Sequence, residues 1–343
     1  MTQIFTYFVL YPRKYNSLPN KTKKFLFLLV KLTIIIGAFY FIYNKVVYNE
    51  HVAFNVFASQ LETTIFNNYT TLLLLLFFSC FNWFFEILKW KTLVSYCKKI
   101  TFVAAAKQSL GSLTASLFTP NRIGEYGAKA IYYKKGTRKK IMLLNLISNS
   151  TQMGVTVLFG SIGLLYFLLH FDVTIELFSL RKLAYLMVLL ILLIVLGSTF
   201  GFKKIRGFYI DKIIHFIKNI PAHIQFKNVL FSIIRYLIFS HQFYFLVYTF
   251  GIQTDYHTAM ALISSMYLLA SLVPSLSFFD WLIKGSVAVW VFSFIQADEL
   301  IIITITLVMW LLNFGIPAIF GSYYVLNFNF SATLEPTKEQ HSS

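Results

Sequence analysis

Acidic residues, cysteines and metal-ligand patterns are all sparse in this sequence. Aspartate and glutamate together number 13 in 343 residues, against 30 lysines and arginines, and charged residues make up only 13% of the chain. The two cysteines, Cys80 and Cys97, lie within or at the edge of apolar runs, which is typical of neither a disulfide framework nor a metal site. The seven histidines show no ligand spacing, so we expect no metal and no cofactor.

Apolar residues, by contrast, are abundant. They make up 57% of the chain, and phenylalanine alone occurs 38 times. A soluble domain of this size has too little interior to hide so much apolar surface. The sequence therefore predicts an all-α integral membrane protein with about six full spans, because six runs approach the ~20 apolar residues that a spanning helix needs: 25–43, 70–85, 141–169, 183–202, 229–252 and 300–328.

The net charge of +17 does not indicate nucleic-acid binding. The basic residues cluster in short segments between the apolar runs, which is typical of cytoplasmic loops that face anionic lipid. By the same rule, the basic lead at 1–24 and the polar tail at 329–343 are cytoplasmic, and 25–328 is one polytopic membrane domain. Richness in Lys, Asn, Ile and Phe favours a bacterial source, hence the inner (plasma) membrane.

Charge counting predicts a re-entrant helical hairpin at 100–133. Lys98 and Lys99 precede this segment and a basic cluster at 134–140 follows it, so both ends are cytoplasmic. Two full crossings need about 40 residues and a turn, and the segment has 34. We expect the chain to enter the membrane, turn partway and return; the alternative is an amphipathic helix pair that lies on the membrane surface.

A second hairpin is predicted at 256–296, where Pro274 interrupts the apolar sequence. No basic residue flanks its end, so this hairpin enters from the outside. Two halves, roughly 70–169 and 229–328, then carry the same elements with opposite orientation. An inverted repeat with two oppositely oriented hairpins is the architecture of many transporters.

The turn of the first hairpin, LFTPNRIGEYGAK at 117–129, begins a helix inside the membrane. Thr119 is predicted as its N-cap and Pro120 as its first helical residue. Such a start exposes unpaired amides and the positive end of the helix dipole. Gly124 allows a neighbouring helix or a lipid headgroup to approach closely.

Three pairs of opposite charge stand at helical spacing within or beside the apolar runs. They are Arg122 with Glu125, Asp280 with Lys284, and Glu86 with Lys89. A charge at membrane depth costs several kcal/mol and is usually kept for a site or a pathway. The residues Thr119, Pro120, Arg122, Gly124, Glu125, Asp280, Lys284 and Glu86 are therefore the candidate substrate-binding set.

Each pair also has a purely structural interpretation. Asp280 could serve a capping box, and the Arg122–Glu125 pair could only fix the hairpin. Glu86, Lys89 and Lys91 could extend toward the cytoplasmic interface. For Arg235 and His241, in the run 229–252, a structural role is favoured.

Three stretches resemble the flippase-like membrane domain of lysylphosphatidylglycerol synthases, which also occurs as a stand-alone protein. TPNRIGEYGAKA at 119–130 is similar to its Pro-x-Arg-x-Gly-Glu hallmark, NWFFEILKW at 82–90 to its second span, and SLVPSLSFFDWLIKGSVAVW at 271–290 to a later proline motif. The resemblance implies a polytopic domain that moves a lipid with a charged headgroup between leaflets. It places Pro120, Arg122, Gly124 and Glu125 in the hallmark, with Asp280 and Lys284 at a second site.

The chain departs from the family in two respects. It has SLSFFD at 275–280 where a glycine-rich turn and a glutamate are expected, which bears on the substrate more than on the fold. It also has no segment that could form the aminoacyl-transferase domain, so lipid lysylation by this chain is not expected.

The leading hypothesis is a translocase for a phospholipid or a polyprenyl-phosphate-linked lipid with an anionic or zwitterionic headgroup. One alternative is an intramembrane lipid-modifying transferase with Glu125 or Asp280 as general base, although no phosphate-binding glycine loop or nucleophile–base spacing accompanies it. The other is a non-transporting subunit that partners a separate lipid-modifying enzyme. A transporter is favoured over an enzyme.

Overall fold

The computed structural model describes residues 62–117, 122–173, 210–272 and 280–328, together with Ser59 and Thr119. The predicted spans at 25–43 and 183–202 lie outside this part of the chain, as do Pro120 and the side chain of Asp280. Regular structure within the described ranges is helical throughout, with no strand. The all-α class is thereby confirmed.

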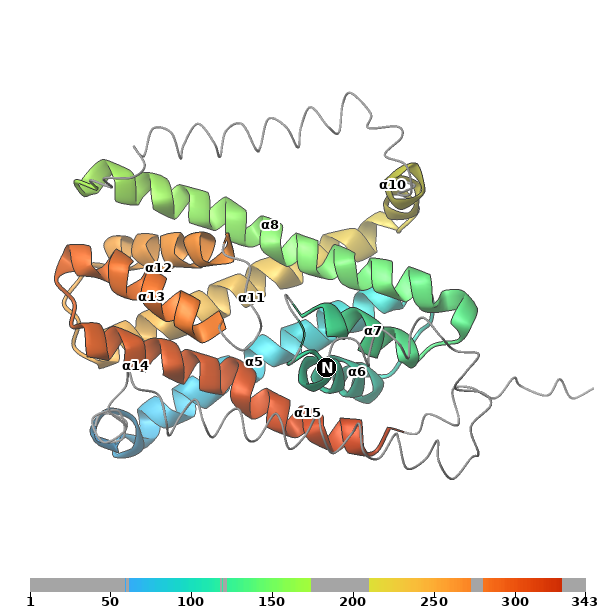
Figure 1. Ribbon diagram of the computed structural model, residues 1–343, viewed down its shortest axis with the longest axis horizontal. Coiled ribbons are helices and arrows are strands. Elements are labelled where there is room, and N and C mark those ends of the chain that lie inside the picture. The colour runs from blue at the N-terminus through green and yellow to red at the C-terminus, as the bar shows by residue number, and fades with distance from the viewer. Residues whose placement is uncertain are drawn as a thin grey trace, which may run out of the picture.

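Four long helical segments run side by side along the molecule (Figure 1). All four are apolar and long enough to cross a membrane, and they coincide with four of the predicted spans. The last segment changes to a π-helical turn at Leu311–Gly315 and then continues as a helix. The segments are α5 (Tyr69–Val94), α8 (Arg138–His170), α11 (Ala222–Thr249), and α14 (Glu299–Trp310) with α15 (Ile316–Leu326).

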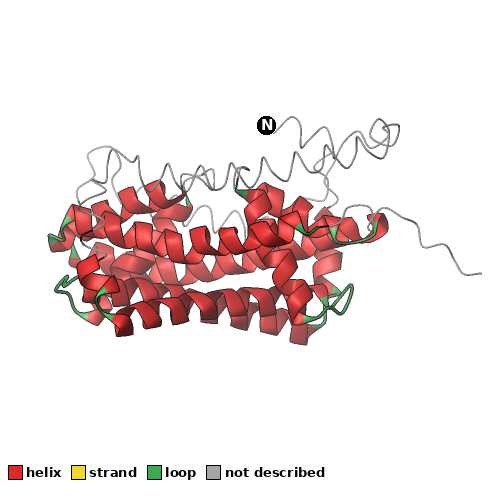
Figure 2. Ribbon diagram, turned by 90° about the horizontal axis from the view of Figure 1, so that it is seen from below, coloured by secondary structure: helices red, strands yellow, loops and turns green. Residues whose placement is uncertain are grey.

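Two pairs of shorter helices complete the bundle: α6 (Phe102–Ser116) with α7 (Ile123–Ile131), and α12 (Tyr256–Ser271) with α13 (Asp280–Phe292). At 1.5 Å per residue they are about 14–24 Å long, which is short of the ~30 Å hydrocarbon core. Figure 1 shows the two pairs at opposite ends of the long helices, and Figure 2 shows the loops gathered at the same two ends. No one of these four helices can cross a bilayer alone.

Side-chain caps begin four of the helices. In each case a side-chain oxygen accepts a hydrogen bond from the backbone amide three residues further on, at 2.9 to 3.2 Å. This satisfies one of the amides that a helix start leaves unpaired. The capping residues are Asn68 of α5, Thr101 of α6, Asp255 of α12 and Asp298 of α14.

Glycines bring each short-helix pair against a long helix of the other half. α12 packs along α8, and α6 packs along α15. A Cβ atom added at Gly163 of α8 would lie 2.8 Å from the Ala261 carbonyl oxygen, and one added at Gly321 of α15 would collide with the Leu110 carbonyl. Small residues thus allow the two backbones to approach closely, as at many helix contacts in membranes.

The buried apolar side chains form two main clusters, one toward each end of the bundle. One cluster includes Leu75, Phe167 and Phe243, and the other includes Trp90 and Ile141. On α5, α8 and α11 a polar stretch separates the residues that belong to the two clusters. The candidate site occupies this stretch.

Candidate functional site

Polar side chains recur at intervals of three, four and seven residues on three long helices. Such spacing puts them on one face of each helix, and most of them are buried. The residues are Ser79, Asn82, Glu86 and Lys89 of α5, Asn145, Ser148 and Gln152 of α8, and Asn228, Ser232, Arg235 and Gln242 of α11.

The first charged group, the Glu86 cluster, consists of Asn82, Glu86, Lys89, Gln152 and Arg235. The Glu86 carboxylate lies 3.0 Å from Lys89 Nζ and 2.5 Å from Arg235 Nη1. Gln152 Oε1 accepts from both cations, at 3.4 and 3.2 Å, and Asn82 Oδ1 accepts from Arg235 Nε at 3.1 Å. The cluster therefore joins α5, α8 and α11 through charge-assisted hydrogen bonds, which are about twice as strong as neutral ones.

Amide side chains extend the Glu86 cluster to the π-helical turn at Leu311–Gly315. Asn82 Nδ2 donates to Asn313 Oδ1, and Asn313 Nδ2 donates to Gln242 Oε1, both at 2.8 Å. The Asn313 carbonyl accepts from the indole of Trp83 at 3.1 Å. A π-helical turn interrupts the regular i to i−4 pattern and is frequent at functional sites, and here it brings Asn313 to α5 and α11.

The second charged group, the Glu125 cluster, consists of Trp90, Arg122, Glu125, Lys129 and Asn145. Glu125 lies 3.1 Å from Arg122 Nη2 and 2.7 Å from Lys129 Nζ. Lys129 also donates to Asn145 Oδ1 at 2.8 Å and sits 4.3 Å from the centroid of the Trp90 ring, within the range of a cation–π contact. The side chains of Lys129 and Glu125 are 1% and 3% exposed, whereas that of Arg122 is 43% exposed.

The turn before α7 differs from the prediction. The helix begins at Ile123, and Arg122 occupies the N-cap with a left-handed backbone, φ 57°, which breaks the right-handed path that a helix start at Pro120 would need. The prediction of Thr119 as N-cap is therefore wrong, and Pro120 lies outside the described residues. The Thr119 hydroxyl still accepts from the amide of Gly124, at 2.9 Å.

Gly124 has the predicted role of allowing close approach. A Cβ atom added there would lie 2.9 Å from both side-chain atoms Cγ2 and Oγ1 of Thr119. The approaching groups are thus the Thr119 side chain and, at 3.1 Å, the backbone carbonyl oxygen of Ala115 in the neighbouring helix α6. The substitution of any larger residue would force Thr119 away from the start of α7.

The structure describes only one side chain of the predicted Asp280–Lys284 pair. Lys284 is half-buried on α13, which packs against α12 and α14, and the side chain of Asp280 lies outside the described residues. The Asp280–Lys284 pairing, and its meeting with Arg122 and Glu125, stay predictions. By contrast, the Arg122–Glu125 and Glu86–Lys89 pairings are present as predicted.

The candidate substrate-binding set did not include several members of these clusters. Arg235 joins the Glu86 cluster, and Lys89 is 1% exposed, so the interpretation in which Lys89 reaches the membrane interface is wrong. His241 lies elsewhere, with its Nε2 2.9 Å from the hydroxyl of Tyr256. The seven-residue spacing of Asn145 and Gln152 within an apolar run was the available signal for a polar face on α8.

The chemistry of the two clusters favours an anion. Their six charged side chains comprise two carboxylates and four cations, a surplus of two positive charges in an apolar bundle. Three buried groups that can donate, Arg122 Nε, Asn145 Nδ2 and Ser148 Oγ, have no hydrogen-bond partner among the described residues, against one acceptor, Glu125 Oε2, whose contact with Arg122 is an ion pair only. Buried donors without partners and an uncompensated surplus of positive charge are both costly, and an anionic ligand can offset both.

A metal does not fit the site. The described residues contain no group of three or more His, Cys, Asp and Glu side chains that could hold one. The Glu86 and Glu125 carboxylates are each engaged by two cations, which leaves them poorly placed as metal ligands.

Comparisons of the chain with protein-family models, with curated proteins and with solved structures find no match. They show no family membership, and the resemblance of 119–130 to the flippase-like domain stays a prediction.

Proposed function

We propose that this protein is a membrane lipid translocase that moves a charged-headgroup phospholipid, or a polyprenyl-phosphate-linked lipid, between leaflets. The observation that carries the proposal is the arrangement of Arg122. Among the six cluster charges its side chain is the most exposed, at 43%, and it lies at the break between α6 and α7. A guanidinium there can meet a headgroup phosphate with bidentate geometry.

The pairing of Glu125 allows Arg122 to exchange partners at low cost. Lys129 Nζ donates to both Glu125 Oε1 and Asn145 Oδ1. The Glu125 carboxylate therefore keeps one cation when Arg122 turns to a ligand. Glu125 would neutralise Arg122 while the site is empty. The Glu86 cluster would add positive potential, which acts strongly where water is excluded.

The arrangement of the helices supports an inverted repeat with halves near 70–169 and 229–328. In the first half α7 packs on α8, and in the second half α13 packs on α14. Between the halves, α8 packs on α12, and in the same way α15 packs on α6. We infer that the two short-helix pairs are re-entrant hairpins from opposite faces, with Lys284 and Asp280 serving the second access path. Rocking of the two halves would then alternate access, as in other inverted-repeat transporters.

The proposed setting follows from the charge pattern and the resemblance. The chain would be a member of the flippase-like synthase-domain family in a bacterial inner membrane, with both termini cytoplasmic. A separate lipid-modifying enzyme would supply the lipid if the headgroup is aminoacylated.

A vesicle assay tests the proposal. Purified full-length protein is reconstituted with fluorescent phosphatidylglycerol, and inner-leaflet lipid is measured by its protection from a membrane-impermeant quencher. Arg122→Ala should slow translocation roughly tenfold, the size expected for a lost charge-assisted hydrogen bond, and Glu125→Gln should slow it as well. Lys107→Ala, at an exposed position of α6, is the matched control.

Two outcomes would contradict the proposal. Unchanged translocation in both Arg122→Ala and Glu125→Gln would show that these residues do not form the substrate-binding site. No translocation by the wild type, together with co-purification of a soluble transferase, would instead favour the partner-subunit alternative.

A further inference from the structure

Two side-chain hydrogen bonds, one helical turn apart, join α7 to α8. Lys129 Nζ donates to Asn145 Oδ1 at 2.8 Å, and Asn149 Nδ2 donates to the hydroxyl of Tyr126 at 3.3 Å. Residue numbers rise along α8 as they fall along α7 from one bond to the next, so the two helices run antiparallel here. The Tyr126–Asn149 pair therefore lies nearer than Lys129 to Arg122 and to the start of α7.

The Tyr126–Asn149 pair is accessible to a ligand. Both residues are half-buried. Asn149 Oδ1 accepts no hydrogen bond from the described residues, and it is not one of their buried atoms without a partner. This oxygen is therefore in contact with the surroundings of the protein. A ligand can reach it without separating α7 from α8.

The pair offers both a donor and an acceptor, whichever way the Asn149 amide is turned. When Asn149 Nδ2 donates, the hydroxyl hydrogen of Tyr126 and the oxygen of Asn149 remain available. When Tyr126 donates to Asn149 instead, the amide hydrogens and a lone pair of the tyrosine oxygen remain available. A ligand hydroxyl both donates and accepts, so it matches the pair in either state. An ammonium group can only donate, and an ionised phosphate can only accept.

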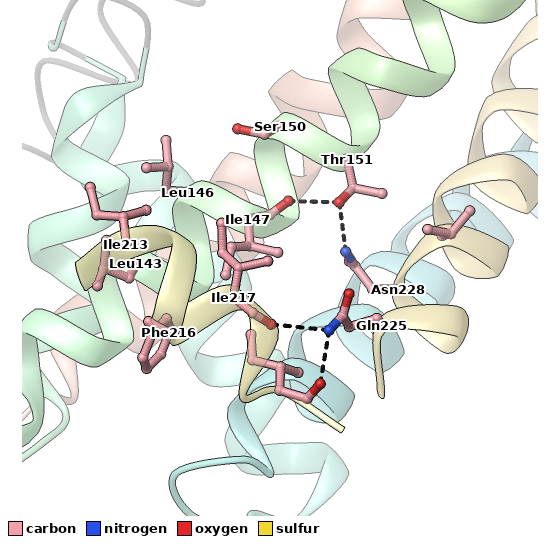
Figure 3. Close-up of a pocket in the computed structure, with 12 residues that line it drawn as sticks. Leu143, Leu146, Ile147, Ser150, Thr151, Ile213, Phe216, Ile217, Gln225 and Asn228 are labelled. Carbon is pink, nitrogen blue, oxygen red and sulfur yellow. Dashed lines mark hydrogen bonds between the residues drawn. The ribbon is translucent and has the colours of Figure 1, made fainter. Parts of the chain in front are cut away.

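The polar residues that follow Asn149 on α8 face a different space. Ser150 and Thr151 line a cavity of about 360 Å³ between α8, α10 (Ile210–Lys218) and α11 (Figure 3). Thr151 is engaged there by its neighbours, because it donates to a carbonyl of its own helix and accepts from Asn228. Asn149 does not line this cavity and is bonded to α7 instead. Its available atoms thus belong to the side of α8 on which the Glu125 cluster lies.

The charges near the pair disfavour a cationic headgroup. Glu86 and Glu125 are each engaged by two cations, and their side chains are only 10% and 3% exposed. The other acidic side chains that the structure describes lie at or next to the ends of helices, outside the polar stretch. They are Glu62, Asp172, Asp255, Asp298 and Glu299. An ammonium group would therefore meet a surplus of positive charge, and like charges at close range are unfavourable.

We propose that the headgroup bound by Arg122 is a phosphate ester with a neutral hydroxyl group, as in a polyol or a sugar, and that Tyr126 and Asn149 bind this hydroxyl. The inference rests on the proposed function, in which Arg122 binds the phosphate. It narrows the substrate from any charged headgroup to an anionic one with a neutral polar end. Zwitterionic and aminoacylated headgroups are disfavoured.

A competition between lipids tests the proposal. Phosphatidylglycerol and phosphatidylmethanol with the same acyl chains carry the same charge, and only the first has hydroxyl groups. The purified full-length protein receives both in equal amounts in a mild detergent, and native mass spectrometry measures the ratio in which they are bound. We expect about fivefold more phosphatidylglycerol, the effect of one hydrogen bond. Phosphatidylethanolamine in the same competition should bind at least about tenfold less than phosphatidylglycerol.

Variants assign the selectivity to the pair. Tyr126→Phe and Asn149→Leu each remove one half of it, and each should lower the phosphatidylglycerol to phosphatidylmethanol ratio toward one. Tyr166→Phe is the matched control. Tyr166 is also half-buried, and its hydroxyl is bonded to one neighbour, Thr258, at 3.2 Å. The ratio should stay near fivefold in this control.

A further competitor distinguishes two sources of such a headgroup. Glucose linked through a phosphate to a polyprenyl chain carries the same combination of phosphate and hydroxyl groups as phosphatidylglycerol. Tighter binding of this compound than of phosphatidylglycerol would indicate a polyprenyl carrier as the source, and weaker binding would indicate a phospholipid. Either result agrees with recognition of the hydroxyl.

Equal binding of phosphatidylglycerol and phosphatidylmethanol by the wild type would overturn the inference, and this comparison needs no variant to fold. A ratio that stays fivefold in both Tyr126→Phe and Asn149→Leu would overturn it too, as would equal binding of phosphatidylethanolamine. If Arg122→Gln still loses these lipids, the proposed function is unaffected by such results. Binding of no lipid by the wild type, or equal binding by Arg122→Gln, would instead contradict the proposed function itself.

Discussion

The Glu86 and Glu125 clusters have the same composition of charge but different surroundings. Each holds one carboxylate between two cations, one of them a lysine with 1% exposure. In the Glu86 cluster the second cation, Arg235, is 16% exposed and is held by amides from α5 and α8. In the Glu125 cluster the second cation, Arg122, is 43% exposed and is bonded only to Glu125 by the described contacts.

The difference assigns the clusters different roles. A buried charge with fixed hydrogen bonds can hold three helices in one arrangement, and it is expensive to disturb. A half-exposed guanidinium at a helix start can leave its partner and bind a ligand. We therefore propose a structural role for the Glu86 cluster and a headgroup-binding role for Arg122.

Removing Glu86 should have the largest effect on stability. Glu86→Ala leaves Lys89 and Arg235 buried without a counter-charge, which costs about 3–5 kcal/mol. Reversible unfolding in mixed detergent micelles measures this cost, with Glu62→Ala, at an exposed position, as control. A loss of unfolding free energy no larger than that of the control would contradict a structural role for this cluster.

Lys129→Met should have an intermediate effect. The substitution conserves volume but leaves Asn145 Oδ1 and one Glu125 oxygen without a donor, at about 1–3 kcal/mol for a buried unsatisfied group. Arg122 still neutralises Glu125, so the cost should stay below that of Glu86→Ala in the same unfolding experiment. A larger stability loss in Lys129→Met than in Glu86→Ala would show that the Glu125 cluster contributes more to the stability of the fold.

Arg122→Gln should cost little stability and much activity. Its ion pair is solvent-accessible on the Arg122 side, so its loss is worth less than about 1 kcal/mol, and Glu125 keeps Lys129. Lipid translocation should nevertheless fall as for Arg122→Ala. Destabilisation equal to that of Lys129→Met would mean that Arg122 has a structural role after all.

The smallest effect is expected at Asp255, an exposed carboxylate outside both clusters. The backbone amide of Thr258 donates to it and lowers its pKa below the ordinary value of 3.8. A lowered pKa stabilises the fold above pH ~3.8, and this stabilisation disappears as the pH falls through the lower folded value. Asp255→Asn should therefore melt slightly below the wild type at pH 7 and equal to it at strongly acidic pH; a gap that grows on acidification would contradict this.

Much of the fold could be predicted from apolar runs and charge counting. The four described long helices and both short pairs stand where hydrophobicity and the basic clusters place them. The length of 100–133 alone predicted two helices too short to cross. The π-helical turn at Leu311–Gly315 could not be predicted, because it depends on contacts of Asn313 with side chains more than 70 residues away.

The site was predictable where partners are close in sequence. Glu86–Lys89 follows from helical spacing within α5, and Arg122–Glu125 joins the N-cap of α7 to its third residue, three positions along the chain. The contacts of Arg235 with α5 and α8 depend on tertiary packing, which spacing within one helix cannot show. The left-handed backbone of Arg122 was missed because the Thr-Pro sequence offers a regular helix start that the tertiary turn does not use.

The most direct test of the account is the lipid that remains bound when the protein is purified. Native mass spectrometry of wild type, Arg122→Gln and Lys107→Gln, prepared in the same mild detergent, compares them directly. We predict an anionic or zwitterionic lipid on the wild type and on Lys107→Gln that is lost from Arg122→Gln, although all three unfold at the same temperature. Equal retention of that lipid by Arg122→Gln would contradict the assignment of Arg122 to the headgroup.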